Sequence, residues 1–166
     1  METWINLGES GFPRYAVSDQ GQIMNEHTNR IVRQSVNQSG TCKIGLYDKD
    51  GCGPIARSVS LLVATYFLPY QGAIFNTPIN LNGDRRDNRS RNLAWRPRWF
   101  AMKYHRQFNR PEYNFKYRIK LLDSGEVFRN AREASIAYGI LEDDIADSFI
   151  TDNSVWPYHF RFQELR

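Results

Sequence analysis

The alternation of apolar and polar residues predicts strands in the first half of the chain. Residues 15–23 and 43–47 alternate with a period of two, as half-buried strands do. The segments Ser-Asp-Gln-Gly at 18–21 and Asp-Lys-Asp-Gly at 48–51 have turn chemistry, because glycine adopts a positive φ at no steric cost. At 58–67 the apolar residues recur instead at helical spacing. This half of the chain is therefore expected to contain a β-hairpin followed by a helix.

In the last third of the chain, the sequence pattern predicts a pair of strands followed by two helices. Asn130 is placed to cap the first helix and Gly139 to end it, because asparagine accepts hydrogen bonds from free amides and glycine tolerates the left-handed conformation. The predicted elements are strands at 117–121 and 126–128, helices at 131–138 and 141–149, and a last strand at 160–162.

Composition excludes several classes of protein. The length of 166 residues suits one ordinary domain or two small ones, and 41% hydrophobic with 14% aromatic residues indicates folded cores rather than disorder. No apolar run is long enough to cross a membrane, and the first residues do not resemble an export signal. The two cysteines, Cys42 and Cys52, are expected to be free thiols in a reducing compartment. We therefore expect a cytoplasmic location and no membrane partner.

The charges are strongly segregated along the chain. Residues 85–120 contain twelve Lys and Arg but two acids, whereas 121–166 contain four bases and nine acids. A basic centre of this kind predicts binding to a polyanion, although a solvated basic face remains an alternative. Aromatic residues interleave with the bases, as they do in many nucleic-acid-binding segments: Tyr104, Phe108, Tyr113, Phe115 and Tyr117.

Residues 79–95 resemble the active-site segment of HNH nucleases, whose pattern is roughly Asp-His-x-(Asn/Asp)-Gly-(Asp/Asn)-x-x-(Asp/Asn)-Asn-x-x-x-Asn-Leu-x-Trp. The scaffold positions that agree are Asn82, Gly83, Asp84, Asp87, Asn88, Asn92, Leu93 and Trp95. The segment before them resembles the N-terminal module of phage intron-encoded homing endonucleases, and the segment from Phe115 onward resembles the small C-terminal module of that family.

The resemblance implies an α+β fold. A small N-terminal β-hairpin and helix module would lead into a ββα-metal motif, followed by a basic linker and a C-terminal β-strand plus helix-turn-helix module. The expected divisions are an HNH-like module at 1–108, a basic and aromatic linker at 109–120, and the helix-turn-helix-like module at 121–166.

The catalytic positions of the family are degenerate in this chain. Ile79 and Asn80 stand where the family has a metal-binding Asp and a general-base His, and Ala101 stands where the helix carries a metal ligand. Asn92 is retained, but in the family this Asn mainly braces the hairpin. The resemblance therefore implies no intact catalytic residue, no metal site and no cofactor. Mg²⁺ is expected as a cofactor only if His105, or the scaffold acids of the loop, form a relocated metal site.

The resemblance and the charges together imply contact with double-stranded DNA. The expected DNA-binding residues are Arg85, Arg86, Arg89, Arg91, Arg96, Arg98, Lys103, Arg106, Arg110 and Lys116. The family lays the second helix of its last module against DNA. Here that helix carries four acids, which would repel phosphates and are a possible protein-binding set, or which simply suit the start of a helix: Glu142, Asp143, Asp144 and Asp147.

Three functions remain open from the sequence. The first is a catalytically inactive, HNH-derived DNA-binding protein, such as a phage or mobile-element regulator. The second is an inhibitor or adaptor that binds a protein partner through the acidic C-terminal module. The third is an active homing endonuclease with relocated metal ligands.

Overall fold

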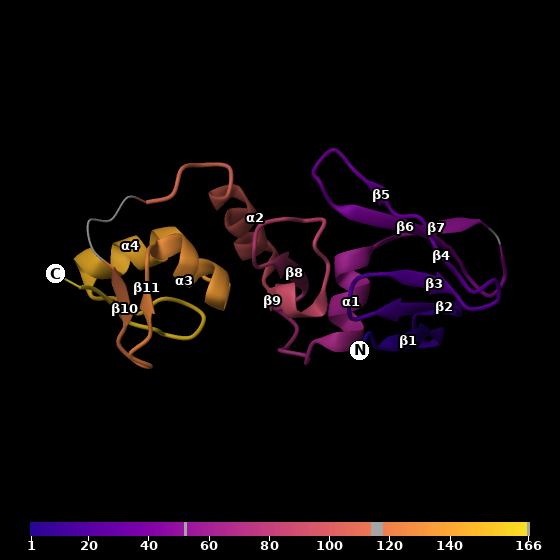
Figure 1. The fold of residues 1–166 in the computed structure, drawn as a ribbon, viewed down its shortest axis with the longest axis horizontal. Coiled ribbons are helices and arrows are strands. Elements are labelled where there is room, and N and C mark those ends of the chain that lie inside the picture. Colours follow the sequence, from indigo (N-terminus) through magenta and orange to yellow (C-terminus); the bar gives the residue numbers. More distant parts are fainter. Residues whose placement is uncertain (52, 114–117, 166) are drawn as a thin grey trace. The chain divides into compact units, whose positions relative to one another are not determined.

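The computed structural model describes residues 1–51, 53–113 and 118–165. The chain forms two compact units, which are described separately below (Figure 1). The first unit comprises Met1–Asn80 and Asp84–Arg98, and the second comprises Leu81–Gly83 and Trp99–Arg166. Among the described residues there are four α-helices and four small antiparallel sheets, which confirms the α+β class expected from the sequence.

The first unit contains three of the sheets and one helix. Its sheets have the strand orders β1-β2-β3-β4, β5-β6-β7 and β8-β9, and all neighbouring strands are antiparallel. The elements are β1 (Trp4–Leu7), η1 (Gly8–Ser10), β2 (Phe12–Ser18), β3 (Ile23–Asn25), β4 (Arg30–Ile31), β5 (Ser35–Val36), β6 (Cys42–Tyr47), β7 (Pro54–Ser58), α1 (Val59–Phe67), β8 (Thr77–Asn80), η2 (Ser90–Asn92) and β9 (Leu93–Arg96).

The core of the first unit follows the predicted periodicities. Along β6 every second residue is buried, so that Cys42, Ile44 and Leu46 face the core. Helix α1 packs on the same cluster through Leu62 and Val63. The predicted hairpin strands and the helix at 58–67 are therefore confirmed, with Cys42 a buried free thiol and Cys52 outside the described residues.

Gly21 ties the first sheet to the loop that follows β8. Its φ is +84°, in the left-handed region that favours glycine. A Cβ atom at Gly21 would lie 3.0 Å from the backbone oxygen of Asn88, which is tighter than most Cβ contacts in proteins. The turn at 18–21 therefore needs glycine both for its conformation and for the close approach of this loop.

The second unit contains the remaining sheet, of order β11-β10-β12, and three helices. Its elements are α2 (Arg98–Gln107, which joins the unit at Trp99), β10 (Ile119–Leu121), β11 (Val127–Phe128), α3 (Ala131–Tyr138), α4 (Glu142–Thr151) and β12 (Phe162–Glu164). The predicted cap is confirmed, because the Asn130 side chain accepts a 2.8 Å hydrogen bond from the Glu133 amide. Gly139 ends α3 with a φ of +61°.

The last strand lies two residues further along than the sequence predicts. Phe160 does not join the sheet but forms an isolated antiparallel bridge with Val155. Phe162, two residues later, begins β12 and pairs with Leu121. Phe160 and Phe162 share the same period of two, so the apolar pattern alone does not fix where pairing starts. The start of the predicted strand at 117 lies outside the described residues.

Helix α2 belongs to the core of the second unit. Tyr104 is fully buried, and its hydroxyl lies 2.7 Å from the carbonyl oxygen of Leu81 and 3.1 Å from that of Ser135 in α3. The Gln107 side chain donates to Ser135 Oγ at 2.8 Å and accepts from the Glu142 amide at 3.1 Å. These contacts group α2 with α3 and α4, whereas the division expected from the sequence places it with the first module.

No helix in the part of the chain that the structure describes is long and apolar enough to span a membrane.

Candidate nucleic-acid interface

The loop between β8 and β9 is closed by two asparagine side chains. Asn80 Nδ2 donates to the carbonyl oxygen of Asp87 at 2.9 Å and lies 3.3 Å from Asn88 Oδ1. Asn92 Nδ2 donates to the same Asp87 oxygen at 2.8 Å. All three asparagines are buried. Asn80, at the general-base position of the HNH pattern, therefore serves as a hydrogen-bond donor that holds the loop.

The two carboxylates of this loop are also engaged within it. Asp84 Oδ1 accepts from the backbone amide of Arg86 at 2.9 Å. Asp87 accepts two hydrogen bonds from the guanidinium of Arg89, at 2.7 and 2.5 Å. The hydrogen bond to Asp87, together with its negative charge, raises the pKa of Arg89 above its usual value. These acids shape the loop.

The remaining positions that the HNH resemblance assigns to catalysis offer no ligand atoms for a divalent metal ion. Ile79 is 0% exposed and pairs with Ala94 across the β8-β9 hairpin. Ala101 is buried in α2. Neither side chain has an oxygen, nitrogen or sulfur atom, whereas Mg²⁺ and similar ions require hard oxygen ligands. Among the described residues, no three His, Cys, Asp or Glu side chains come together as a possible metal site.

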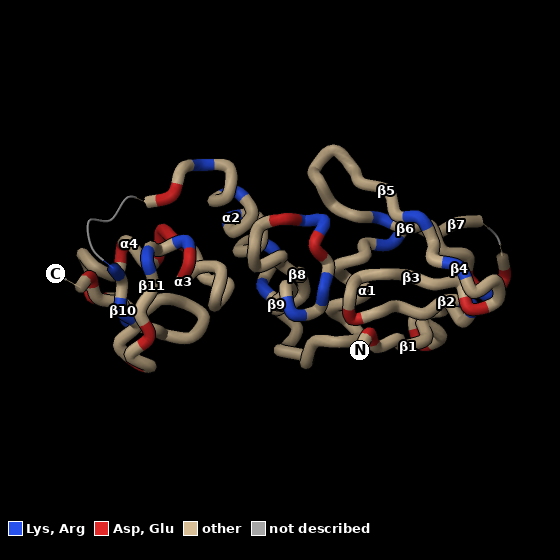
Figure 2. Tube along the Cα trace, in the orientation of Figure 1, with Lys and Arg blue, Asp and Glu red and all other residues tan. Residues whose placement is uncertain are grey.

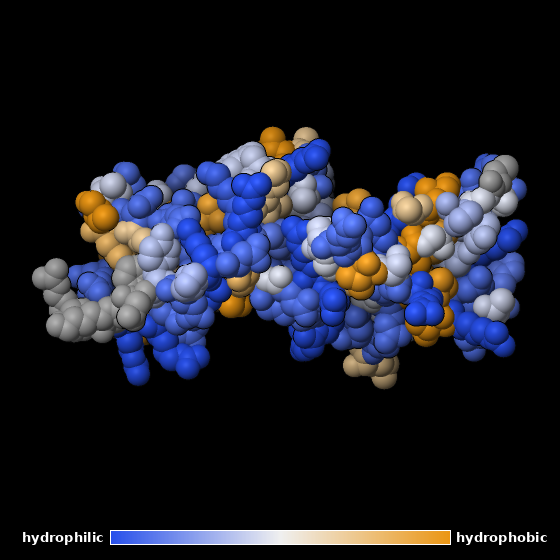
Figure 3. Space-filling view, turned by 90° about the horizontal axis from the view of Figure 1, so that it is seen from above, coloured by the Kyte–Doolittle hydropathy of each residue, from blue (hydrophilic) through white to orange (hydrophobic). Residues whose placement is uncertain are grey.

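Most of the predicted DNA-binding residues lie at the surface. Figure 2 shows Lys and Arg positions along the β8-β9 loop and along α2. Six of the ten are exposed, namely Arg86, Arg91, Arg98, Lys103, Arg106 and Arg110. Arg85 and Arg89 are half-buried, and Lys116 lies outside the described residues. Figure 3 shows that hydrophilic side chains cover most of the face that it presents, with separate apolar patches among them.

In addition to Arg89, which pairs with Asp87, three of the predicted bases have hydrogen-bond or ion-pair partners within the protein. Arg96 is 1% exposed and donates to the carbonyl oxygen of Trp95 at 2.7 Å, so its guanidinium belongs to the interior. Arg85 donates to the carbonyl oxygen of Ser39 at 3.1 Å. Arg110 forms a 2.6 Å ion pair with Asp143. The surface that remains available to phosphates is therefore smaller than the set of bases in the sequence.

Of the aromatic residues that interleave with these bases, Tyr104 and Phe108 pack against the protein, whereas Tyr113 is 38% exposed. Tyr104 is buried, and the ring of Phe108 lies against Gly83, where a Cβ atom would collide with it. The Tyr113 hydroxyl donates to Asp143 at 2.6 Å. Phe115 and Tyr117 lie outside the described residues.

Sequence reasoning missed the exposed apolar residues of α2, which are Trp99 and Met102. The signal was the helical spacing of residues 98–107. The buried positions of α2 are 100, 101, 104 and 107, and they leave 99, 102, 103 and 106 on the opposite face.

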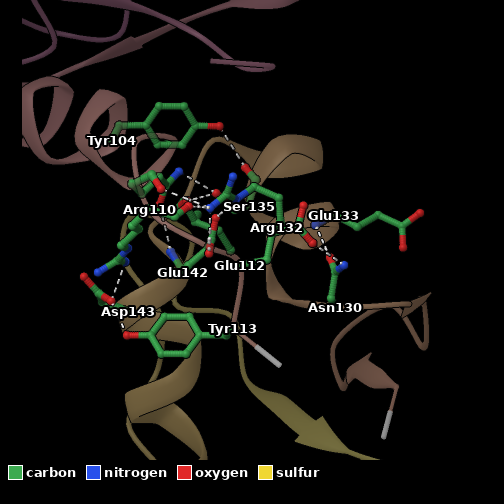
Figure 4. Close-up of polar contacts among 12 residues, drawn as sticks. Tyr104, Arg110, Glu112, Tyr113, Asn130, Arg132, Glu133, Ser135, Glu142 and Asp143 are labelled. Atoms are coloured by element: carbon green, nitrogen blue, oxygen red, sulfur yellow. Dashed lines mark hydrogen bonds and ion pairs between the residues drawn. The ribbon is translucent and has the colours of Figure 1, made fainter. Parts of the chain in front are cut away.

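The acids of α4 differ in exposure, with Glu142 buried and Asp143 partly exposed, and Figure 4 shows these two with their partners. Glu142 is 0% exposed and forms an ion pair with Arg132. Burial raises the pKa of Glu142, although the hydrogen bond and charge of Arg132 oppose this. Asp144 is half-buried and Asp147 is exposed. A protein partner could therefore reach fewer of these acids than their number in the sequence implies.

Asp143 and Asp144 are electrostatically coupled to the bases around α2. Burial acts to raise the pKa of Asp143, but hydrogen bonds from Arg110 and Tyr113 outweigh it and hold that pKa below the usual value. Burial raises the pKa of Asp144, and the positive charge of Lys103 opposes the shift. The acids at the start of α4 thus partly neutralise the positive charges of Lys103 in α2 and of Arg110 beyond its end.

Comparison with known proteins agrees with this geometry. No protein-family model matches the chain. It is 34% identical over 95 residues, 57% of its length, to "Uncharacterized HNH endonuclease L247" of Acanthamoeba polyphaga mimivirus. The chain spans 23% of that protein's length.

A solved structure shares the fold over almost the whole chain. It is described as "DNA binding and cleavage by the HNH homing endonuclease I-HmuI", and it matches with a TM-score of 0.53 at 18% sequence identity, covering 98% of each chain. The chain therefore has the fold of an HNH homing endonuclease, as the resemblance of residues 79–95 led us to expect.

Proposed function

We propose that this protein binds duplex DNA on an HNH endonuclease scaffold and does not cleave it. The observation that carries the proposal is the replacement of the catalytic set. Ile79 and Ala101 have no ligand atoms, and the amide of Asn80 holds the loop at Asp87. The same region of sequence keeps the exposed bases of the loop and of α2. In this proposal β8, β9 and α2 correspond to the ββα-metal motif of the family.

The chemistry of phosphodiester hydrolysis explains why cleavage should be lost. A general base must remove a proton from the attacking water, and an asparagine amide cannot do so near neutral pH. A divalent ion must also stabilise the charge that develops on the phosphate oxygens. With both functions missing, we infer that Mg²⁺ is not a cofactor of this chain.

Binding to DNA needs none of these catalytic groups. Each Lys or Arg that neutralises a phosphate releases condensed counterions, so affinity comes from the bases and falls as salt rises. Arg86 and Arg91 offer such contacts from the first unit, and Lys103 and Arg106 offer them from the second. Similarity to a structure described as binding and cleaving DNA supports this part of the proposal.

The charges at the start of α4 argue against the groove-binding role that the family gives to the second helix of this module. In a helix-turn-helix, residues at the start of the second helix contact base edges. The start of α4 carries Glu142, Asp143 and Asp144, and the first two already bind Arg132 and Arg110. We therefore propose that α4 supports α2 instead of entering a groove.

The two alternatives have weaker support. Binding of a basic protein partner through α4 would depend mainly on Asp144 and Asp147, because Glu142 is buried and Asp143 is paired. A relocated metal site would have to use His105, Asp84 or Asp87, and the two carboxylates accept hydrogen bonds from loop residues. A DNA-binding regulator of a phage or mobile element is the role that this combination of features fits best.

The proposal is tested by retention of a labelled, mixed-sequence duplex over a range of salt concentrations. We expect retention that weakens linearly on a log–log plot against salt. Absence of retention even at low salt would contradict DNA binding. Retention of a basic protein in place of the duplex would favour the adaptor alternative.

A further inference from the structure

The exposed face of α2 combines apolar and basic side chains. We call this face, formed by Trp99, Met102, Lys103 and Arg106, the α2 stripe. Trp99 is 55% exposed and Met102 is 51% exposed. Large apolar side chains at the surface of a folded protein frequently mark a contact site when they occur together. Here they lie about one helical turn apart, and the two bases follow them along the same face of the helix.

Trp99 is held in place although it is exposed. Its ring centroid lies 5.6 Å from that of Trp156, at an interplanar angle of 41°, and 5.7 Å from that of Phe100 in an edge-on arrangement. Lys103 Nζ lies 5.6 Å from the centroid of the Trp99 ring, within the range of a cation–π interaction. The indole is therefore pre-oriented at the surface, and ordering it on binding costs little conformational entropy.

We propose that Trp99 and Met102 insert against the bases of duplex DNA while Lys103 and Arg106 neutralise the neighbouring phosphates. This inference rests on the proposed DNA-binding function and assigns it a contact surface. Apolar wedges flanked by Lys and Arg are a recurrent way to open a base step, because packing against the side chain replaces the base stacking that is given up. The π-face of an indole also stacks on any base, so the contact requires no particular sequence.

Two acids of α4 act on the bases at this end of the helix, and a polyanion would compete with them. Asp143 pairs with Arg110, beyond the C-terminal end of α2, and Asp144 is coupled electrostatically to Lys103. Arg106 lies one turn further along the same exposed face as Lys103. Phosphates can therefore compete for Lys103, which in the free protein is shared between Asp144 and the Trp99 ring.

The apolar and electrostatic parts of the contact can be separated by experiment. Duplex affinity is measured against salt for the wild type, Trp99→Ala and Arg106→Ala. We expect Trp99→Ala to lose about tenfold in affinity at every salt concentration, with an unchanged log–log slope, because the contact is apolar. We expect Arg106→Ala to flatten that slope by about 0.9, because one phosphate is no longer neutralised by the protein.

Tryptophan emission provides a second measurement that does not depend on the alanine variant, which could be destabilised. DNA should quench part of the emission of the wild type, and Trp99→Phe should remove that quenching while keeping an aromatic ring in place. Trp4→Phe, in the first unit, should leave the quenching intact. Circular dichroism confirms that each variant is folded.

The outcomes separate this inference from the proposed function. No retention of duplex by the wild type would contradict DNA binding itself. A second outcome is that the wild type and Trp99→Ala retain duplex with equal affinity and that DNA still quenches the emission of Trp99→Phe. This outcome would overturn the proposed role of the α2 stripe but not DNA binding itself. Quenching of Trp99 by vesicles of anionic phospholipid but not by duplex would also overturn it and assign the stripe to a membrane surface.

Discussion

The side-chain amide of Asn80 donates a 2.9 Å hydrogen bond to the backbone carbonyl of Asp87. This bond spans the loop between β8 and β9, and Asn92 donates to the same oxygen from the start of the returning strand. The position that the sequence resemblance assigns to a general base thus carries a side chain that donates a hydrogen bond to the loop. The shape of the loop depends on this bond and on the bond from Asn92.

Asn80→Ala should destabilise the first unit without abolishing folding. The carbonyl oxygen of Asp87 would keep its bond to Asn92, but the bonds from Asn80 to Asp87 and to Asn88 would be removed. We expect the free energy of unfolding to fall by about 1–2 kcal/mol, measured by denaturant titration. The matched control is Gln71→Ala at an exposed position, which should change it little. Equal stability of both variants would show that the Asn80 bond does not hold the loop.

Four exposed bases should account for much of the salt dependence of DNA binding. Replacement of Arg86, Arg91, Lys103 and Arg106 by Ala should flatten the log–log salt slope by about 0.9 for each phosphate that the variant no longer neutralises. The control variant also removes four positive charges, two from each unit. Its alanine substitutions are at Arg14, Arg30, Arg129 and Arg161. If the slope flattens equally in both variants, the salt dependence comes from the overall charge of the protein and not from the proposed surface.

The acids at the start of α4 should weaken DNA binding by holding bases of the second unit. Asp143→Asn frees Arg110 from its ion pair, and Asp144→Asn removes the carboxylate coupled to Lys103. Each pair is partly exposed to solvent, so we expect each substitution to raise duplex affinity by only about twofold to fivefold. Glu9→Gln, in the first unit, is the control for net charge. Lower affinity in the Asp143 or Asp144 variant would mean that α4 itself helps to bind DNA.

The raised pKa of Asp144 gives this effect a pH dependence. Burial favours the neutral acid, so Asp144 takes up a proton at a higher pH than an ordinary aspartate as the pH falls from neutral. Loss of its charge should raise the affinity of the wild type for duplex as the pH falls. The same titration in Asp144→Asn should be flatter over that interval, and identical profiles for the two proteins would exclude a contribution from Asp144.

The buried pair of Arg132 and Glu142 should be essential to the second unit. Glu142 is fully buried, and Arg132 also donates to the carbonyl oxygen of Gln107 at 3.0 Å, at the end of α2. Glu142→Ala leaves the guanidinium without its carboxylate, and we expect a cost of about 3 kcal/mol in the stability of this unit. Glu142→Gln keeps an acceptor oxygen and should cost less. If both variants unfold at the wild-type denaturant concentration, the pair does not anchor α2.

Local sequence signals predicted much of the fold. The helix from Val59, the cap at Asn130 and the αL glycine at Gly139 follow from side-chain spacing and backbone preferences over a few residues. The loop of the HNH-like segment was recognised because its asparagines and aspartates bond to neighbouring backbone, which fixes their spacing.

Local signals do not predict that α2 packs in the second unit. Tyr104 reads as one more aromatic residue in a basic segment, yet its hydroxyl bonds to Ser135 in α3, thirty-one residues later. Burial of Arg96 and exposure of Trp99 likewise depend on packing between distant segments. Periodicity identifies the two faces of a helix, but it does not identify which segment covers one of them.

We propose that this protein holds DNA but does not cut it, and one assay can test both parts together. The most direct measurement incubates pure protein with supercoiled plasmid, with Mg²⁺, with Mn²⁺ and with chelator, and divides each reaction between a retention assay and an agarose gel after removal of protein. A single nick converts supercoiled plasmid to the relaxed form, so the gel detects even rare cleavage. We predict retention in all three conditions and no relaxed or linear product above the protein-free control. Relaxed plasmid that appears with Mg²⁺ or Mn²⁺ and not with chelator would contradict the account.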